Sequence, residues 1–381
     1  MNATKLALGT RRVIGLFPEL LGVGGVQEAG RLTAAAILGI ARRRGWSIDF
    51  ISLNDPYGSH SVGVDGLGVP FRAFGRAKVR FSLAGIRSAY SLPAGTAAVV
   101  LAAHPNLALP ALWIRRSRPN LKTIVMSHGI EVWKPLPSFR RRALMHANVA
   151  LAPSTDTANK LIDVQGVAAE RVRKLAWPVA PTFLRMADAP TCLRRPAAFP
   201  TGLVILTVGR WAASERYKGA DDLIRAVVQL HAEIPGLHLV AVGGGDDLPR
   251  LRKLAAESGV VERVHFFENL SREDLAACYF HADIFALPSS GEGFGLVFLE
   301  AMAFSKPVVG ASFGGATDVI EDHVNGLLVP PADSGRLARV LSRLLRDESL
   351  RERLGRRGGE IVRERYGFEV FENELANVLG D

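Results

Sequence analysis

The chain has 381 residues, of which 48% are hydrophobic and 22% charged, and its formal net charge is +10. This length is too great for one ordinary hydrophobic core and predicts two domains. The two cysteines, Cys192 and Cys278, exclude a disulfide framework and indicate a reducing compartment.

The first twenty residues lack the layout of a signal peptide, because Arg11, Arg12 and Glu19 interrupt their apolar part. The longest uncharged run, residues 88–114, contains three prolines and therefore suits a strand, a loop and a helix start. The sequence predicts no transmembrane helix.

Apolar runs alternate with helix-length amphipathic segments along the chain. A first strand is expected at 11–17, then a glycine loop at 21–26 and a helix at 27–45 that Gly45 ends. Further strands are expected at 46–53, 96–103, 121–127 and 148–154. This alternation predicts βαβ units and a parallel sheet.

A connection between domains is expected at 177–200, which holds five prolines in 24 residues. A second series of strands follows at 202–209, 237–243, 263–267, 282–288 and 306–310, and the tail from about Ser334 has an Arg-rich helical pattern. Two doubly wound sheets joined in this way are expected to leave a cleft, with ligands at the carboxyl ends of the strands.

The stretch SSGEGFGLVFLE, which follows the expected strand at 282–288, combines glycines with two carboxylates. We expect a helix to begin near Gly293, so that its first backbone N–H groups have no helical partner and can bind a phosphate. These are the N–H groups of Phe294, Gly295 and Leu296.

The two carboxylates of this stretch are Glu292 and Glu300. Glu292 precedes the anion site and has capping of the helix as its structural alternative. Glu300 lies among apolar residues, where a carboxylate needs hydrogen-bond donors, and ribose hydroxyls are suitable. The pair predicts a site in which one carboxylate accepts hydrogen bonds from sugar hydroxyls and the other from ribose hydroxyls, with a phosphate bound between them.

With its E-x7-E pattern EGFGLVFLE, the chain resembles the retaining family-4 glycosyltransferases. The resemblance covers nearly the whole chain and includes residues 22–32, 127–133, 208–226, 242–289 and 314–333. It implies the α/β class and the GT-B fold, with two Rossmann-like doubly wound parallel-sheet domains that face each other across a cleft.

The resemblance also implies domain boundaries. An N-terminal acceptor-binding domain is expected at 1–180, a linker at 181–200 and a nucleotide-sugar-binding domain at 201–360. A C-terminal helix at 361–381 can pack back on the N-terminal domain.

The resemblance assigns roles to single residues. Arg210 and Lys218 would bind the donor diphosphate, and phosphates do require fixed positive charge. His128, at a strand end, would reach the transferred sugar, and the nucleobase would lie near residues 264–269. The implied catalytic residues are His128, Arg210, Lys218 and Glu292, and the implied donor-binding residues are Gly24, Gly25, Arg210, Lys218, Phe294, Gly295, Leu296 and Glu300.

Each of these residues has a structural alternative: a solvated helix start for Lys218, an ordinary tight turn for Gly24 and Gly25, and a packing role for His128. Residues 177–183 also stand where many relatives carry an Asn-Gly-Val-Asp-like turn, and the segment from Arg210 to Lys218 is longer than usual.

No metal and no cofactor is expected. The sequence has no D-x-D pattern and no Cys/His cluster with zinc spacing. Arg210, Lys218 and a helix N-terminus can supply the positive charge that Mg²⁺ would otherwise provide.

The implied function is transfer of a hexose, with retention, from a UDP- or GDP-sugar to a lipid-linked or polysaccharide acceptor in bacterial-type cell-surface glycan synthesis. A nucleotide-sugar epimerase or phosphorylase of the same fold stays open, as does a non-catalytic nucleotide-sugar or membrane-binding subunit. A dinucleotide oxidoreductase fits less well, because GVGGVQ is not G-x-G-x-x-G.

Charge is uneven along the chain. Residues 1–180 carry 24 Lys and Arg against 9 Asp and Glu, a net of +15, and residues 181–381 carry 23 against 28, a net of −5. The basic half indicates an anionic partner, and an anionic membrane surface fits. Nucleic acid is not expected, since no nucleic-acid module is recognisable. We therefore expect a cytoplasmic protein, peripheral at the inner face of the cell membrane, with residues 137–147 as a candidate contact and a solvated helix face as the alternative.

Overall fold

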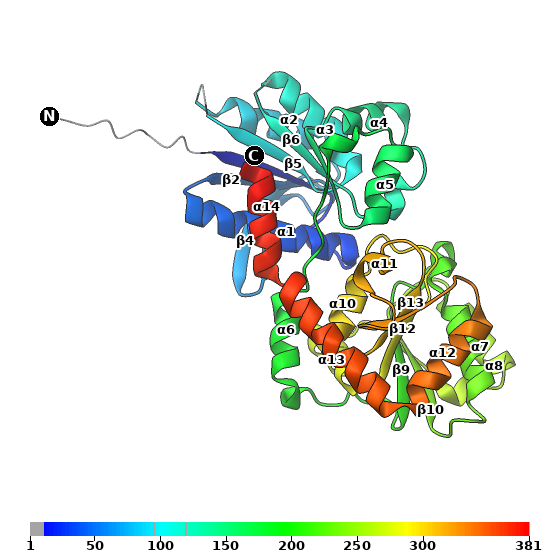
Figure 1. Ribbon diagram of the computed structural model, residues 1–381. Coiled ribbons are helices and arrows are strands. Elements are labelled where there is room, and N and C mark those ends of the chain that lie inside the picture. Colours follow the sequence, from blue (N-terminus) through cyan, green and yellow to red (C-terminus); the bar gives the residue numbers. More distant parts are fainter. Residues whose placement is uncertain (1–10, 94–95, 119, 381) are drawn as a thin grey trace. The chain divides into compact units, whose positions relative to one another are not determined.

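The computed structural model describes residues 11–93, 96–118 and 120–380. The chain forms two compact units (Figure 1). The first comprises Met1–Trp177 together with Phe368–Asp381, and the second comprises Pro178–Gly367.

The first unit is built on an eight-stranded sheet in the order β3-β4-β2-β1-β5-β6-β7-β8. All its described pairs are parallel except β3 with β4, which form an antiparallel pair at the edge of the parallel sheet that the sequence predicts. Its strands are β1 (Arg12–Phe17), β2 (Ser47–Ser52), β3 (Gly58–Val64), β4 (Leu67–Ala73), β5 (Ala98–Ala102), β6 (Lys122–Met126), β7 (Val149–Ala152) and β8 (Val172–Lys174).

Five helices between these strands and one from the chain's end complete the first unit. They are α1 (Gly25–Arg44), α2 (Lys78–Tyr90), α3 (Ala108–Ser117), α4 (Ser138–Met145), α5 (Thr155–Asp163) and α14 (Phe368–Gly380). Figure 1 shows α14, in red, lying against α1. Its buried Leu375 and Leu379 face the unit's core, and Glu372 forms an ion pair of 2.8 Å with Arg43.

The second unit has a six-stranded parallel sheet in the order β11-β10-β9-β12-β13-β14. Its strands are β9 (Leu203–Val208), β10 (Leu237–Val242), β11 (Val264–Phe267), β12 (Ile284–Leu287), β13 (Val308–Ala311) and β14 (Gly326–Val329). Its helices are α6 (Pro181–Asp188), α7 (Ala220–Leu230), α8 (Leu248–Glu257), α9 (Arg272–His281), α10 (Leu296–Ala303), α11 (Ala316–Val319), α12 (Ser334–Arg346) and α13 (Glu348–Arg365).

The strand order reverses once in each sheet, between β1 and β5 in the first unit and between β9 and β12 in the second. Parallel α/β sheets bind ligands at the carboxyl ends of the strands beside such a reversal. The loops that follow β9 and β12 are therefore the places where the second unit can hold a ligand. Within the described residues, no helix is both long enough and apolar enough to cross a membrane.

Candidate functional site

The loop after β9 carries Arg210 and is held against the loop after β10 by backbone contacts. The N–H of Trp211 donates to the carbonyl of Gly244 at 2.9 Å, and the carbonyl of Trp211 accepts from the N–H of Asp247 at 2.9 Å. A Cβ on Gly245, whose φ is +156°, would lie 2.1 Å from the carbonyl oxygen of Trp211. Only glycine allows the two loops to approach this closely.

An ion-pair network fixes the next turn, the 3₁₀ segment Ala213–Lys218. Arg216 donates to Asp247 at 3.0 and 3.2 Å, and Arg250 bridges Asp247 and Asp221 at 2.6 to 2.8 Å. The hydrogen bond from Arg250, together with that from Arg216, lowers the pKa of Asp247 although its burial opposes this. The network therefore holds the segment that presents Lys218.

Two cations and two carboxylates alternate at the end of this segment. Arg210 forms an ion pair with Glu215, and Lys218 Nζ lies 3.6 Å from Glu215 Oε2 and 3.9 Å from Glu292 Oε1. The side chain of Arg210 is 73% exposed, whereas those of Lys218 and Glu292 are 17% and 14% exposed. The structure thus brings Arg210, Lys218 and Glu292 together, with Glu215 as a link that the sequence analysis missed.

The loop after β12 brings Glu292 to this cluster. The N–H of Ser290 donates to the carbonyl of Tyr217 at 2.8 Å, and a Cβ on Gly291 would lie 2.6 Å from the Tyr217 ring. The carbonyl of Glu292 accepts from the N–H of Gly315 at 2.8 Å. Three loops, after β9, β12 and β13, therefore meet at Glu292.

Burial is the largest influence on the Glu292 carboxyl and raises its pKa, while Lys218 and a hydrogen bond from Ser289 act in the opposite direction. A buried carboxylate with one cation at 3.9 Å is only partly compensated. Such a group is available to accept hydrogen bonds from a ligand.

Helix α10 begins at Leu296, three residues later than the expected start near Gly293. Gly295 adopts a left-handed conformation with φ +94° and caps the helix, which places Phe294 outside it. Within the described residues, the N–H groups of Phe294, Gly295 and Leu296 donate no hydrogen bond. The three predicted amides are therefore available to an anion, although only one belongs to the helix.

Glu300 has a partner that the sequence analysis did not foresee. The hydroxyl of Tyr279, a fully buried side chain on α9, donates to Glu300 Oε2 at 2.8 Å. Burial, followed by the nearby Glu300, raises the pKa of Tyr279 well above its usual value. A carboxylate has about four acceptor positions, so this bond is compatible with an additional ligand hydroxyl.

In the first unit, Gly24 precedes α1 with φ +144° and Gly25 is its first residue. The buried Asp55 holds the loop that leads to them, because its carboxylate accepts from the N–H groups of Leu20 and Leu21 at 2.8 and 3.0 Å. Asp55 lies more than thirty residues along the chain from this loop, so no local pattern could have indicated the contact.

His128 follows β6 and lies in a stack of rings in the first unit. Its ring centroid is 5.8 Å from that of His104 and 5.4 Å from that of Trp177. Its Nε2 lies 2.8 Å from the carbonyl oxygen of Ala103, to which the ring donates in one tautomer. This bond leaves Nδ1 as an acceptor. Burial lowers the pKa of His104 to about 4, with Glu131 opposing the shift.

The structure therefore divides the predicted residues between the two units. The first unit holds Gly24, Gly25 and His128, and the second holds the cluster around Lys218, the α10 amides and Glu300. No group of three or more His, Cys, Asp or Glu side chains in the described part of the chain could hold a metal ion. The positive charge of the second-unit site comes from Arg210 and Lys218.

Comparison with known proteins gives the following likenesses. Residues 193–360 match the family described as glycosyl transferases group 1. The chain is 35% identical over 236 residues to the D-inositol 3-phosphate glycosyltransferase of Acidothermus cellulolyticus, covering 58% of this chain and 52% of that protein. It is 35% identical over 169 residues to a GDP-mannose-dependent alpha-(1-6)-phosphatidylinositol monomannoside mannosyltransferase of Mycobacterium tuberculosis, covering 42% and 44%.

The chain thus spans about half the length of these curated relatives. Among solved structures, the fold is similar to that of sucrose-phosphate synthase from Thermosynechococcus elongatus, with a TM-score of 0.75 and 22% identity over 97% of this chain and 98% of that one. The predicted GT-B fold is confirmed.

Proposed function

Because residues 193–360 match the family described as glycosyl transferases group 1, we propose that the chain is a retaining glycosyltransferase. It moves a hexose from a UDP- or GDP-sugar to an acceptor hydroxyl. The observation that supports this most directly is the cluster of Arg210, Lys218 and Glu292 beside the α10 amides, at the point where the strand order of the second sheet reverses.

Each part of the cluster has a chemical role in the proposal. Arg210 and Lys218 neutralise the donor diphosphate, and the N–H groups of Phe294, Gly295 and Leu296 bind its oxygens. Glu292 accepts hydrogen bonds from hydroxyls of the transferred hexose. Glu300 accepts from ribose as well as from Tyr279.

The bond to the anomeric carbon breaks as the acceptor oxygen approaches from the same face, and the leaving phosphate takes the acceptor proton. No side chain of the cluster is needed as a nucleophile in this scheme. Catalysis then consists of positioning and of stabilising the charge that develops on the diphosphate. The two cations supply that stabilisation, so we propose that the reaction is independent of metal. His128 of the first unit contacts the transferred sugar, and Gly24 and Gly25 let the backbone approach the donor or acceptor.

For the acceptor, we propose a lipid-linked or polysaccharide substrate of cell-surface glycan synthesis. The net charge of +15 on residues 1–180 suits an anionic surface, and two similar proteins are named for inositol phosphate and phosphatidylinositol substrates. The protein would work in the cytoplasm, peripherally at the inner face of the membrane.

The test measures how fast the unaltered chain and the variant Arg210→Ala release diphosphate from a panel of UDP- and GDP-hexoses. Loss of one preorganised cation should lower turnover by about 10²–10³-fold. Arg225→Ala, on α7, is the matched control, because Arg225 is another exposed arginine of the second unit with one acidic partner, Asp222 at 3.1 Å. Turnover of Arg210→Ala within a few-fold of the control would contradict the role given to Arg210, and no turnover of any sugar by the unaltered chain would contradict the proposal.

A further inference from the structure

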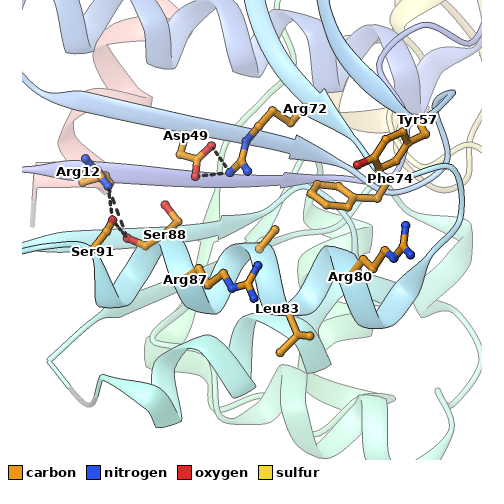
Figure 2. A pocket seen from close by; sticks show the side chains of 11 residues that line it. Arg12, Asp49, Tyr57, Arg72, Phe74, Arg80, Leu83, Arg87, Ser88 and Ser91 are labelled. Atoms are coloured by element: carbon orange, nitrogen blue, oxygen red, sulfur yellow. Dashed lines mark hydrogen bonds and ion pairs between the residues drawn. The ribbon is translucent and has the colours of Figure 1, made fainter.

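A pocket of about 640 Å³ lies in the first unit between α2 and the strands β1, β2 and β4 (Figure 2). None of its lining residues belongs to the proposed donor site or to the glycine loop. Its volume is within the range of small-molecule sites, roughly 300–1,000 Å³. The glycosyltransferase proposal gives this pocket no role.

Four arginines line the pocket against one carboxylate, Asp49. Arg72 donates to both oxygens of Asp49 at 2.8 and 2.9 Å, so this pair is neutral. Among the described residues, Arg12 donates only to uncharged groups, one of which is the hydroxyl of Ser91 at 3.0 Å. The side chains of Arg80 and Arg87 form no hydrogen bond or ion pair with any described residue. Three positive charges therefore stand without a compensating anion.

The two unpaired arginines lie on one face of α2. They are seven positions apart, which is two helical turns or about 10 Å along the axis. One phosphate cannot contact both at full strength over this distance, whereas a ligand with two separate anionic groups can. The guanidinium group suits phosphate in particular, because its planar donors bind two oxygens at once.

The rest of the pocket is suited to a ring with hydroxyl groups. Figure 2 shows Arg80 pointing toward Phe74 and Tyr57, whose rings offer an apolar surface at one end. The hydroxyl of Ser88 points from α2 toward the strands. Its Oγ is buried and has no hydrogen-bond partner among the described residues, and such a group is costly to leave unpaired.

We propose that this pocket binds a sugar or polyol ring that carries two phosphate groups. Arg80 binds one phosphate and Arg87, with Arg12, binds the other, while the ring lies against Phe74 and Tyr57. The ligand is either a free sugar bisphosphate or the phosphorylated headgroup of a lipid. The inference is independent of the proposed transfer reaction.

The test is calorimetric titration of the full chain with glucose 1,6-bisphosphate, with glucose 1-phosphate and glucose as comparisons. The bisphosphate should bind at least about tenfold more tightly than the monophosphate, and glucose should not bind measurably. The double variant Arg80→Gln/Arg87→Gln should lose at least about tenfold in affinity for the bisphosphate. Arg42→Gln/Arg116→Gln removes the same charge from exposed helical positions of the first unit outside the pocket, and should bind as the unaltered chain does.

Circular dichroism confirms that each variant is folded. Equal affinity in the two double variants would overturn the proposal, as would binding that survives Arg80→Gln/Arg87→Gln and is lost in Arg210→Ala, since the phosphates would then occupy the donor site. Vesicles containing phosphatidylinositol 4-phosphate, whose headgroup is a polyol ring that carries two phosphates, distinguish the two sources. Release of vesicle-bound protein by the bisphosphate would identify a lipid headgroup as the occupant, and bisphosphate binding that leaves the vesicles bound would identify a soluble ligand.

Discussion

At the scale of one residue, the burial of Glu292 in the candidate ligand site lowers the stability of the fold when its carboxylate is charged. Its carboxylate is 14% exposed and its pKa is raised chiefly by burial. Because the unfolded chain releases this proton at a lower pH than the folded chain, stability falls as the pH rises from the ordinary glutamate pKa through the folded value. Above that window the charged form works against folding.

We therefore expect Glu292→Gln to lose donor turnover while its melting temperature at pH 7 equals or exceeds that of the unaltered chain. Lys218 keeps Glu215 as a partner at 3.6 Å, so the substitution leaves no isolated cation. The gain in stability should shrink as the pH falls toward 4, because protonation of Glu292 removes the buried charge that opposes folding. Thermal unfolding at the two pH values measures this, and a variant that is less stable than the unaltered chain at pH 7 would contradict it.

The pKa of His104 is shifted in the opposite direction to that of Glu292. The His104 pKa of about 4 lies below the usual 6.5, so the unfolded chain takes up the proton first as the pH falls. The stability that depends on neutral His104 is complete above pH 6.5 and is lost between 6.5 and 4, on the order of 3 kcal/mol.

His104→Asn should make the decline in stability between pH 6.5 and 4 shallower. Nδ1 of His104 accepts from the N–H of Asn106 at 3.0 Å, and an asparagine side chain can accept the same bond. Denaturant unfolding across this pH range measures the effect. His323→Asn is the control, because His323 is exposed and its φ of +62° is one that asparagine tolerates. An unchanged slope in His104→Asn would contradict the prediction.

Single site residues could be predicted from the sequence where they lie within a recognisable local pattern. Glu292 and the α10 amides could be located in this way, since they lie in a short motif that follows the end of β12, whereas Lys218 was placed only by the family resemblance. Glu215 and Tyr279 could not. The turn AASERYK has no periodicity, and the bond from Tyr279 to Glu300 depends on how α9 packs against its neighbours.

At the scale of elements, α13 packs against α10, the helix that carries Glu300, through glycines. A Cβ on Gly355 would lie 1.9 Å from the carbonyl oxygen of Ser305, just beyond the end of α10. A Cβ on Gly358 would lie 2.9 Å from Met302 Cγ. These glycines allow the two helices to approach closely.

We expect Gly355→Ala to destabilise the second unit. In an exposed helix the change would add about 1 kcal/mol of stability, but here the backbone carbonyl of Ser305 cannot move aside as a side chain can. Overpacking of this kind costs about 1–3 kcal/mol. Denaturant unfolding measures the loss, and Gly335→Ala on α12, which would meet only side-chain atoms at 3.6 Å or more, is the control. Equal stability of the two variants would contradict the expectation.

The element predictions succeeded where strands are apolar and lie inside a sheet. All ten predicted strands are present, and Gly45 ends α1 in a left-handed conformation as expected. The missed strands are β3, β4, β8 and β14. Of these, β3 has the sequence GSHSVGV, with little apolar alternation, and β8 has three residues. Residues 181–188, inside the predicted linker, form α6, in which Pro181 occupies the first turn where a missing N–H is tolerated.

At the scale of the whole molecule, it remains a prediction that the basic half of the chain, residues 1–180, binds an anionic membrane surface. Within the run FRRRA on α4, Arg140 donates to Asn106 and Arg141 to the carbonyl of Gln165, each at 2.9 Å. Arg142 is exposed, and its neighbour Phe139 is 55% exposed. Phe139 and Arg142 are therefore the better residues to change, because Arg140 and Arg141 make contacts within the unit.

We expect the protein to co-sediment with anionic vesicles and not with neutral ones. Binding should weaken as salt is raised from 0.1 M to 1 M, over which the Debye length falls from about 10 Å to about 3 Å. Phe139→Ser/Arg142→Gln should bind less than Arg225→Gln, a control of equal charge loss in the second unit. Equal binding to neutral and anionic vesicles, or none to either, would contradict the prediction.

The return of α14 to the first unit has a consequence for biosynthesis. The second unit occupies a continuous stretch, Pro178–Gly367, whereas the first unit needs both the beginning and the last residues of the chain. A ribosome therefore synthesises every residue of the second unit before it makes α14. Until then, the surface of α1 that α14 covers stays open on the nascent chain. The part of the protein that is synthesised first is thus the last to be completed.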